Sequence, residues 1–216
     1  MKIILASGSP RRRELLQQAG LVFTVMSADI DESVMAAETP QAYIQRMVAQ
    51  KTQAALATLN AEQALPTDSE QPFLLLTADT IGILPDGKTI LIKPEDNAHA
   101  LNMWQQMSAN THQVCTAVQA TLITATTAQA SDTGLIFTPI WSQSILESTA
   151  VTFVELAAAE MQRYWQTGEP ADKAGGYAIQ GGAAHWVARI EGSYTNVVGL
   201  PLAQTLALIE QARAAI

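Results

Sequence analysis

Three consecutive arginines, Arg11 to Arg13, come directly after a Ser-Gly-Ser-Pro turn at residues 7–10. Ser9 suits the N-cap and Pro10 the first position of a helix, so the arginines fall in its first turn. The positive end of the helix dipole disfavours exposed cations there by roughly 0.3–1 kcal/mol each. A helix N-terminus behind a glycine-containing turn binds anions, and arginines beside it bind phosphate. The pattern therefore predicts a local phosphate site, with a solvated charged helix face as the alternative.

Carboxylates that could accompany a phosphate occur in two places. Asp79 follows the apolar run PFLLLTA, which predicts a strand that ends at this aspartate. Open α/β sheets bind ligands beyond the carboxyl ends of their strands. Asp29, Asp31 and Glu32 form an acidic run that could join Asp79 around Mg²⁺, since this ion takes one or two carboxylates together with phosphate oxygens. A turn aspartate and a solvated acidic run are the alternatives.

Two lysines and a glycine-rich segment add further candidates. Lys51 lies on a predicted helix, and Lys93 precedes a proline just after a predicted strand. Each lysine could contact phosphate or lie on the surface. Residues 168–182 place several glycines beside charged and amide side chains, among them Gln180. This indicates either a close approach of the backbone to another group or a loop-rich structural corner.

Other catalytic classes find no support in the sequence. The Walker A spacing and the Gly-x-Ser-x-Gly elbow are both absent. His99, His112 and His185 are widely separated and lack the spacing of a zinc site. Cys115 is the only cysteine, lies in a strand-like run and is predicted to be a core residue. A single cysteine allows no intrachain disulfide, which fits a reducing compartment.

Composition limits the partners that the chain can have. Its 216 residues carry a formal net charge of -8, and 48% of them are hydrophobic, enough for one large core or two modest lobes. An acidic chain is a poor general binder of nucleic acid or of anionic membranes, because both need broad basic surfaces. No apolar run approaches the ~18 residues of a membrane span or reads as a signal peptide. We therefore expect a cytoplasmic protein with no nucleic-acid or membrane partner.

The order of predicted elements indicates an α/β fold with a mixed sheet. Strands are expected at residues 2–6, 22–26, 73–78, 114–124 and 136–155, and helices at 10–19, 40–59, 95–107, 157–167 and 201–216. A hairpin is expected around residues 85–87, and polar connectors at 60–72 and 127–134. Helices alternate with strands early in the chain, whereas the middle favours antiparallel pairs.

Five stretches match one known pattern in wording, order and spacing: LASGSPRRRELL, ADT, KPEDNAHAL, THQVCTAV and GEPADKAGGYAIQGGAAHWVARIEGSYTNVVGLPL. Together they strongly resemble the Maf family of nucleoside triphosphate pyrophosphatases, from about residue 2 to residue 202. The resemblance implies a single Maf-like domain over residues 1–216. It also implies a mixed α/β sheet with two lobes around a deep cleft, an architecture related to the inosine triphosphate pyrophosphatases. Members of the family are often homodimers.

The resemblance implies hydrolysis of the α–β phosphoanhydride of a nucleoside triphosphate, assisted by a divalent metal, Mg²⁺ or Mn²⁺. Asp79 would accept the proton of the attacking water and lie at the metal, and Glu32 would assist the metal or the water. The residues implied around the phosphates are Ser7, Arg11, Arg12, Lys51 and Lys93. Their charges would stabilise the triphosphate, and such stabilisation supplies most of the catalysis of phosphoryl transfer.

Three positions resemble one substrate branch of the family. Because it has Arg11, Thr80 and Gln180, the chain resembles the branch that acts on dTTP and UTP. The branch that acts on 7-methyl-GTP has Trp, Gln and Glu at the corresponding positions. The chain departs from the usual family pattern at four positions. It has Gly82 where the family usually has aliphatic residues and a valine after Asp-Thr, and Ile92 where the family usually has a glycine before Lys-Pro. It also has Ala109 and Asn110 where the family usually has Gly-Arg. These departures affect loops rather than the charged groups.

Two other functions remain open for this sequence. One is a catalytically weak regulator that binds nucleotides and restrains septum formation, and the other is a pyrophosphatase for 7-methyl-GTP or another modified nucleotide. Retention of Asp79 beside Arg11, Lys51 and Lys93 favours the enzyme, because binding alone needs no base next to the cationic cluster.

Overall fold

The computed structural model describes residues 1–62, 71–127 and 135–216. Its strands are β1 (Lys2–Ala6), β2 (Phe23–Met26), β3 (Phe73–Ile83), β4 (Ile90–Leu91), β5 (Thr111–Thr127), β6 (Leu135–Phe153) and β7 (Val187–Glu191). Its helices are α1 (Pro10–Gln18), α2 (Pro40–Glu62), α3 (Asn97–Met107), α4 (Ala158–Gln166), α5 (Tyr194–Val198) and α6 (Leu202–Ala214), with 3₁₀ turns η1 (Glu169–Asp172), η2 (Ala174–Gly176) and η3 (Ala184–Trp186). No helix among these residues is long and apolar enough to cross a membrane. The connectors expected at 60–72 and 127–134 lie mostly outside the described residues.

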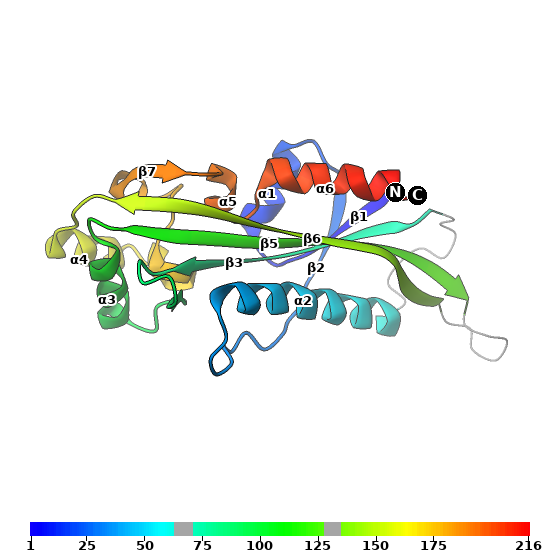
Figure 1. Cartoon of the computed structure of the whole chain (residues 1–216), viewed down its shortest axis with the longest axis horizontal. Helices are drawn as coiled ribbons and strands as arrows, with labels where there is room; N and C mark the ends of the chain where they lie inside the picture. Colours follow the sequence, from blue (N-terminus) through cyan, green and yellow to red (C-terminus); the bar gives the residue numbers. More distant parts are fainter. Residues whose placement is uncertain (63–70, 128–134) are drawn as a thin grey trace.

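One mixed sheet runs along the molecule in the order β2-β1-β3-β5-β6-β7, and β4 pairs with β3 (Figure 1). β2, β1 and β3 are parallel neighbours, whereas β4, β5, β6 and β7 run antiparallel to the strands they pair with. Parallel neighbours need a crossover connection, and here the crossovers contain α1 and α2. The α/β class with a mixed sheet, expected from the sequence, is confirmed.

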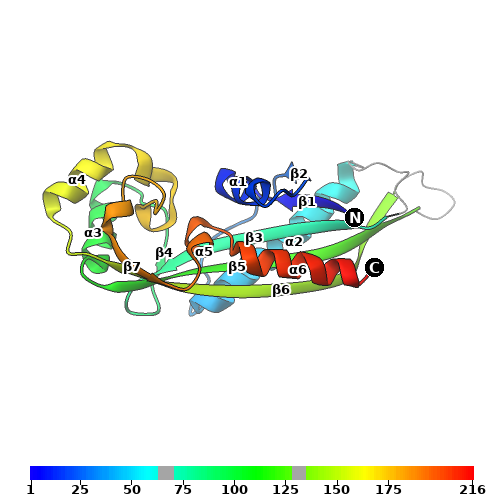
Figure 2. The same ribbon diagram turned by 90° about the horizontal axis from the view of Figure 1, so that it is seen from above.

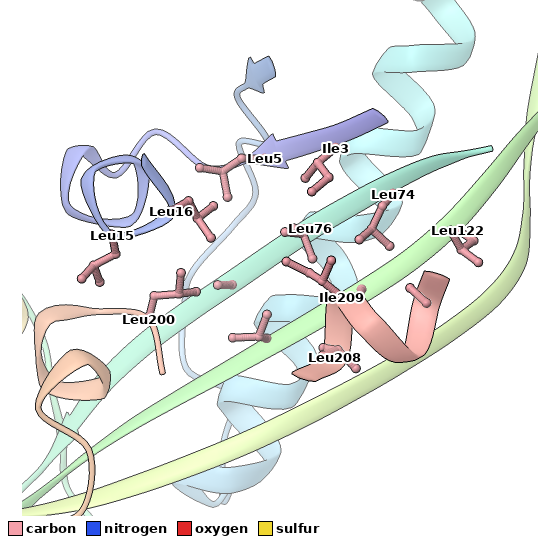
Figure 3. Close-up of a cluster of buried hydrophobic side chains, with 14 of the residues drawn as sticks. Ile3, Leu5, Leu15, Leu16, Leu74, Leu76, Leu122, Leu200, Leu208 and Ile209 are labelled. Carbon is pink, nitrogen blue, oxygen red and sulfur yellow. The ribbon is translucent and has the colours of Figure 1, made fainter. Parts of the chain in front are cut away.

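The alternation of side chains along β1 explains why both faces of the sheet are covered. Ile3 and Leu5 point to the face packed by α1 and α6, where Leu16 and Leu208 are also buried (Figure 3). Ile4 and Ala6 point to the opposite face, against the Ala55 and Leu59 side of α2. Figure 1 shows α2 on one side of the sheet and α1 and α6 on the other. A strand covered on both faces is expected to read as a continuous apolar run, as β1 does.

A second core lies at the other end of the sheet, around α3 and α4 (Figure 2). Trp104 and Trp186 are fully buried there, with ring centroids 5.2 Å apart. His112 lies in the same core, its Nε2 2.7 Å from the hydroxyl of Tyr177, and burial lowers its pKa to about 4. Aromatic packing of this kind adds to the stabilisation that comes from buried area alone. The separate cores give the molecule two lobes, as expected.

β3 differs from the prediction, because it continues past Asp79 to Ile83. Its parallel pairing with β1 ends at Ala6 and Thr77, where the apolar run also ends. Its antiparallel pairing with β5 continues and sets Asp79 opposite Ala117. Asp79 is therefore within β3 rather than at its end, although it does lie just beyond the carboxyl end of β1.

The N-cap residues of α1 and α3 differ in whether their side chains make a capping hydrogen bond, which residue type alone does not predict. Ser9 is the N-cap of α1 but makes no side-chain capping hydrogen bond, whereas Asp96 caps α3 by accepting a hydrogen bond of 2.7 Å from the N–H of His99. At the turn after α3, Ala109 has a φ of +52°, in the left-handed region that favours glycine. This is one of the positions at which the sequence departs from the family pattern.

Replacing Ala109 with glycine is expected to stabilise the protein by about 0.5–1 kcal/mol. The left-handed conformation costs a Cβ-bearing residue roughly 1–2 kcal/mol, and the extra chain entropy of glycine offsets part of the gain. Urea denaturation of the purified Ala109→Gly protein measures the change. Ala57→Gly, an exposed change within α2, is the control and is expected to lower stability, because glycine is a poor helix former. A loss of stability in both variants would contradict the assignment of strain to Ala109.

Candidate active site

A cavity of about 810 Å³ opens beside the carboxyl end of β1. It is bordered by the turn after β1, the start of α1, the loop before α2, the middle of β3, the residues after β4 and the segment 172–180. All nine predicted site residues line it: Ser7, Arg11, Arg12, Glu32, Lys51, Asp79, Thr80, Lys93 and Gln180. The fold thus brings together residues that are as much as 173 positions apart in the chain.

Two carboxylates and one lysine form the centre of the site. Lys51, on α2, places its Nζ 2.5 Å from Oδ1 of Asp79 and 2.9 Å from Oε1 of Glu32. Asp79 and Lys51 are largely buried, whereas about half of the Glu32 side chain is exposed. Burial raises the pKa of Glu32, but the hydrogen bond and charge of Lys51, with Lys93 and Arg12 further away, outweigh burial and lower it overall. Glu32 is therefore ionised at neutral pH.

Arg12 is buried against acceptors of the protein itself. Its Nε donates to the carbonyl of Gly199 at 2.8 Å, and its Nη1 donates to the carbonyl of Ala78 at 2.8 Å. Nη1 and Nη2 also reach the hydroxyls of Ser7 and Thr80, at 3.1 and 3.0 Å. Burial lowers the pKa of Arg12, and the charge of Asp79 partly offsets this effect. The guanidinium therefore joins the turn after β1, the middle of β3 and the segment before α6.

The other two arginines of the triplet have different surroundings. Arg11 is half-buried and lines the cavity, whereas Arg13 is exposed and is not part of the lining. Arg11 accordingly lies next to the first N–H groups of α1, which have no acceptor within the helix. Ser7 adds a hydroxyl that accepts from Arg12 and, at 3.3 Å, from the N–H of Ser9. Because it is the acceptor in both bonds, Ser7 keeps its own hydrogen to donate.

Thr80 is held in a hydrogen-bonded network on the inner wall of the cavity. Its hydroxyl accepts from Arg12, lies 2.9 Å from the hydroxyl of Thr116, and is 3.2 Å from the carbonyl of Gly199. Thr116 is fully buried and continues the network to the backbone carbonyl of Asn196. Because these hydrogen bonds fix the hydroxyl of Thr80, they also fix the methyl group on the same Cβ, and the residue forms a fixed part of the cavity wall.

Gln180 is exposed at the rim of the cavity, at the end of a segment that the second lobe holds firmly. The indole N–H of Trp104 donates to the carbonyl of Gly175 at 3.0 Å, and the N–H of Ala178 donates to the hydroxyl of Tyr164 at 3.1 Å. Gly175 has a φ of +71°, and a Cβ there would lie 3.3 Å from the side chain of Leu91. Glycine is therefore favoured here by the backbone conformation, and a side chain would in addition require a small shift of Leu91.

Tyr43 and Tyr177, which the sequence analysis did not select as site residues, also line the cavity, as do Asp29 of the acidic run and Asp172 and Lys173 of the glycine-rich segment. Tyr43 could have been found from its spacing, because positions 43, 47 and 51 fall on one face of a helix and Lys51 is at the site. Lys173 donates to Asp172 and to the carbonyl of Glu169, so its charge is shared with the protein. Both residues belong to the glycine-rich segment 168–182, but the sequence assigns neither of them a role.

Two of the departures from the family pattern lie close to the cavity. Gly82, on β3, faces Leu91, on β4, and a Cβ at position 82 would come within 2.6 Å of the Leu91 side chain. Leu91 therefore fills the space that a side chain at position 82 would need. Ile92 is exposed and lines the cavity directly before Lys93.

The cleft combines a helix N-terminus, cationic side chains and the carboxylates of Asp79 and Glu32, all held by a mixed α/β sheet. Such a cleft suits a phosphorylated ligand. The chain belongs to the Maf family, because the family model described as "Maf-like protein" matches residues 2–212. The membership expected from the sequence motifs is confirmed.

Relatives of known name cover nearly the whole chain. A dTTP/UTP pyrophosphatase of Psychrobacter arcticus is 56% identical over 219 residues, with 98% of this chain and 95% of the relative covered. A dTTP/UTP pyrophosphatase of Pseudoalteromonas atlantica is 43% identical, with 97% and 96% covered. One of Acinetobacter baylyi is 40% identical, with 97% and 99% covered.

The hydrogen bonds of Arg12 predict that its loss destabilises the fold. Arg12→Ala is expected to lower the free energy of unfolding by at least about 2 kcal/mol, because the buried carbonyls of Ala78 and Gly199 lose their charged donor. Arg13→Ala, an exposed change on the same helical turn, is the matched control and is expected to stay within about 0.5 kcal/mol of the parent. Urea denaturation measures both, and equal stabilities would contradict a structural role for Arg12.

Proposed function

We propose that this chain hydrolyses the α–β phosphoanhydride of dTTP and UTP and releases the nucleoside monophosphate and pyrophosphate. The observation that carries the proposal is the meeting of Asp79, Glu32 and Lys51 in a cavity that Arg11 and Lys93 also line. The named activity of the Psychrobacter and Pseudoalteromonas relatives supports the same reaction and the same nucleotides. A base beside the cationic cluster favours an enzyme over a nucleotide-binding regulator.

Asp79 is proposed to accept the proton of the attacking water. Its Oδ1 bonds to Lys51, which leaves Oδ2 to accept from a water in the cavity. Lys51 fixes the orientation of the carboxylate, which general base catalysis requires. When the water attacks the α-phosphorus, its proton passes to Asp79 and pyrophosphate leaves.

The triphosphate is proposed to lie along the cationic side of the cavity. The first turn of α1 offers backbone N–H groups, Ser7 offers a hydroxyl, and Arg11 and Lys93 offer charges that are not buried in the protein. Arg12 contributes indirectly, by holding the turn that carries Ser7. The chain as a whole is acidic and would repel an anionic substrate, so this local positive charge is needed for the triphosphate to bind.

A divalent metal, Mg²⁺ or Mn²⁺, fits the carboxylates of this site. Asp79 and Glu32 already share one cation, the ammonium group of Lys51, so their oxygens converge. The described residues contain no group of three or more His, Cys, Asp or Glu side chains that could hold an ion. Magnesium needs only one or two carboxylates when phosphate oxygens and water complete its shell. Bound beside Asp79 and Glu32, the ion would neutralise charge that develops on the phosphates.

Gln180 and Thr80 are proposed to lie at the nucleobase. A side-chain amide both donates and accepts, so Gln180 can pair with the alternating carbonyl and N3–H edge of uracil or thymine. Thr80, held by Arg12 and Thr116, offers its methyl group and a fixed wall. We further propose that residues 1–216 act as one Maf-like domain, in the cytoplasm and as a homodimer, as in many members of the family.

Asp79→Asn is expected to lower kcat by at least about 10²-fold with little loss of stability, because the amide cannot accept the proton. Pyrophosphate release from dTTP and UTP, with Mg²⁺ or Mn²⁺ present, measures the activity. Glu14→Gln, an exposed change on α1, serves as the control with unchanged turnover. Near-normal pyrophosphate release by the folded Asp79→Asn protein would exclude Asp79 as the base.

Gln180→Glu is expected to lower kcat/KM for dTTP and UTP by roughly 5- to 150-fold, since a carboxylate accepts but cannot donate and would face the base carbonyls unfavourably. The loss should be smaller for 7-methyl-GTP, whose charged ring and N1–H and N2–H₂ edge suit a carboxylate. Measuring kcat/KM for these nucleotides and for GTP decides between the outcomes. An unchanged ranking of substrates would mean that Gln180 does not contact the base.

A further inference from the structure

Glu32 belongs to the segment 27–39, which contains no helix or strand and connects β2 to α2. Much of this segment is exposed, including Val34 and Met35 at 47% and 56%. A carboxylate on such a segment needs further contacts if it is to keep one position at the site. Its bond to Lys51 alone joins two flexible side chains, one of them half exposed, and exposed ion pairs of this kind contribute little.

Tyr43 supplies one of these contacts from the first turn of α2. Its hydroxyl donates a hydrogen bond of 2.8 Å to the backbone carbonyl of Glu32 itself. The ring is only 7% exposed and packs in the core beside Ile81 and Ile83 of β3. Burial and the nearby charges of Asp79 and Glu32 raise the pKa of Tyr43 to about 12, so the hydroxyl remains a donor throughout the neutral range. The hydrogen bond thus joins Glu32 to a rigid part of the fold.

Arg46 supplies the next contact, one turn further along α2. Its Nη2 donates to the carbonyl of Ser33 at 2.9 Å, directly after the carbonyl that Tyr43 binds. Nε and Nη2 also bind the two carboxylate oxygens of Glu38, at 2.7 and 2.6 Å, and so attach the end of the same segment. The guanidinium lies over the Tyr43 ring, 5.4 Å from its centroid. Two successive carbonyls are therefore held by two side chains that stack on each other.

We propose that Tyr43 and Arg46 are positioning residues that fix Glu32 toward Lys51 and Asp79 through the carbonyls of Glu32 and Ser33. The inference rests on the proposed function, because it assigns a role in the reaction to groups that do not themselves react. Tyr43, Arg46 and Lys51 all belong to α2, so one helix sets both the cation and the carboxylate that it binds. Without the hydrogen bonds from Tyr43 and Arg46, the Glu32 carboxylate would no longer be held toward Lys51 and Asp79.

Tyr43→Phe tests the proposal, because it removes the hydroxyl and retains the ring that packs in the core and lies under Arg46. It is expected to lower kcat by about 3- to 10-fold, the loss of one hydrogen bond, and to raise the Mg²⁺ or Mn²⁺ concentration needed for half-maximal activity by a similar factor. Tyr194→Phe, at a tyrosine that is 45% exposed and does not itself line the cavity, is the matched control with unchanged kinetics. Arg46→Lys, which removes the fork that holds Ser33 and Glu38, should act in the same direction as Tyr43→Phe.

A double-mutant cycle with Glu32→Gln separates positioning from an independent effect. If Tyr43 acts through Glu32, Tyr43→Phe has little effect once Glu32 is replaced, and the two losses are not additive. Equal losses in both backgrounds, or no loss in the parent, would overturn the proposal.

A readout without activity completes the test. Cleavage by a glutamate-specific protease after Glu32 and Glu38, mapped by mass spectrometry, is expected to be at least about threefold faster in Tyr43→Phe than in the parent or in Tyr194→Phe, because the segment opens more often. Unchanged cleavage would show that Tyr43 does not tether the segment. A parent protein that releases no pyrophosphate would instead contradict the proposed function, so the two failures are distinguishable.

Discussion

The arrangement of the site depends on the point at which β3 loses its pairing with β1 and keeps its pairing with β5. After Thr77 this strand has no parallel partner, because β1 ends at Ala6 and the chain turns away into α1. The antiparallel partner β5 remains, so β3 continues as a regular strand through Asp79 and Thr80. One side of a rigid strand is thereby left open to the cavity, and its side chains are presented to a ligand without an additional loop.

The charges in this opening are arranged by burial as well as by sign. Arg12 is enclosed by carbonyl and hydroxyl acceptors and ties the edges of the opening together, whereas Arg11 and Lys93 remain accessible. Lys51 has an intermediate role, since it is largely buried but bound to two carboxylates. Cationic residues of similar type thus have two different roles: Arg12 stabilises the walls of the cavity, whereas Arg11 and Lys93 are free to contact a ligand in it.

Local patterns in the sequence predict much of this molecule. The β1 turn, α1, α2, the hairpin at β4 and the class of the sheet all follow from apolar runs, turn residues and helix signals. The extension of β3 could not be predicted in this way, because it depends on pairing with β5, 38 positions away at Asp79 and Ala117. β7 and α5 also lacked a clear local signal, and β7 is defined by its pairing with β6.

The same limit applies to the site. Nine residues selected from motifs and residue types do line one cavity. The three arginines in the first turn of α1 read alike in the sequence, and their different surroundings are decided by acceptors elsewhere, such as the carbonyl of Gly199. The helical spacing of Tyr43 and Lys51 could indicate that Tyr43 lies near the site, but its hydrogen bond to the backbone of Glu32 is visible only in the structure.

The packing of Gly82 against Leu91 has a consequence for sequence divergence within the family. A Cβ at position 82 would lie 2.6 Å from the side chain of Leu91 on β4, so a side chain there requires Leu91 to move. The two positions are therefore coupled, and a valine at position 82 becomes acceptable only in a background where residue 91 is smaller or displaced. Chimaeras with relatives should therefore exchange β3 and β4 together, so that the residues at positions 82 and 91 come from the same background.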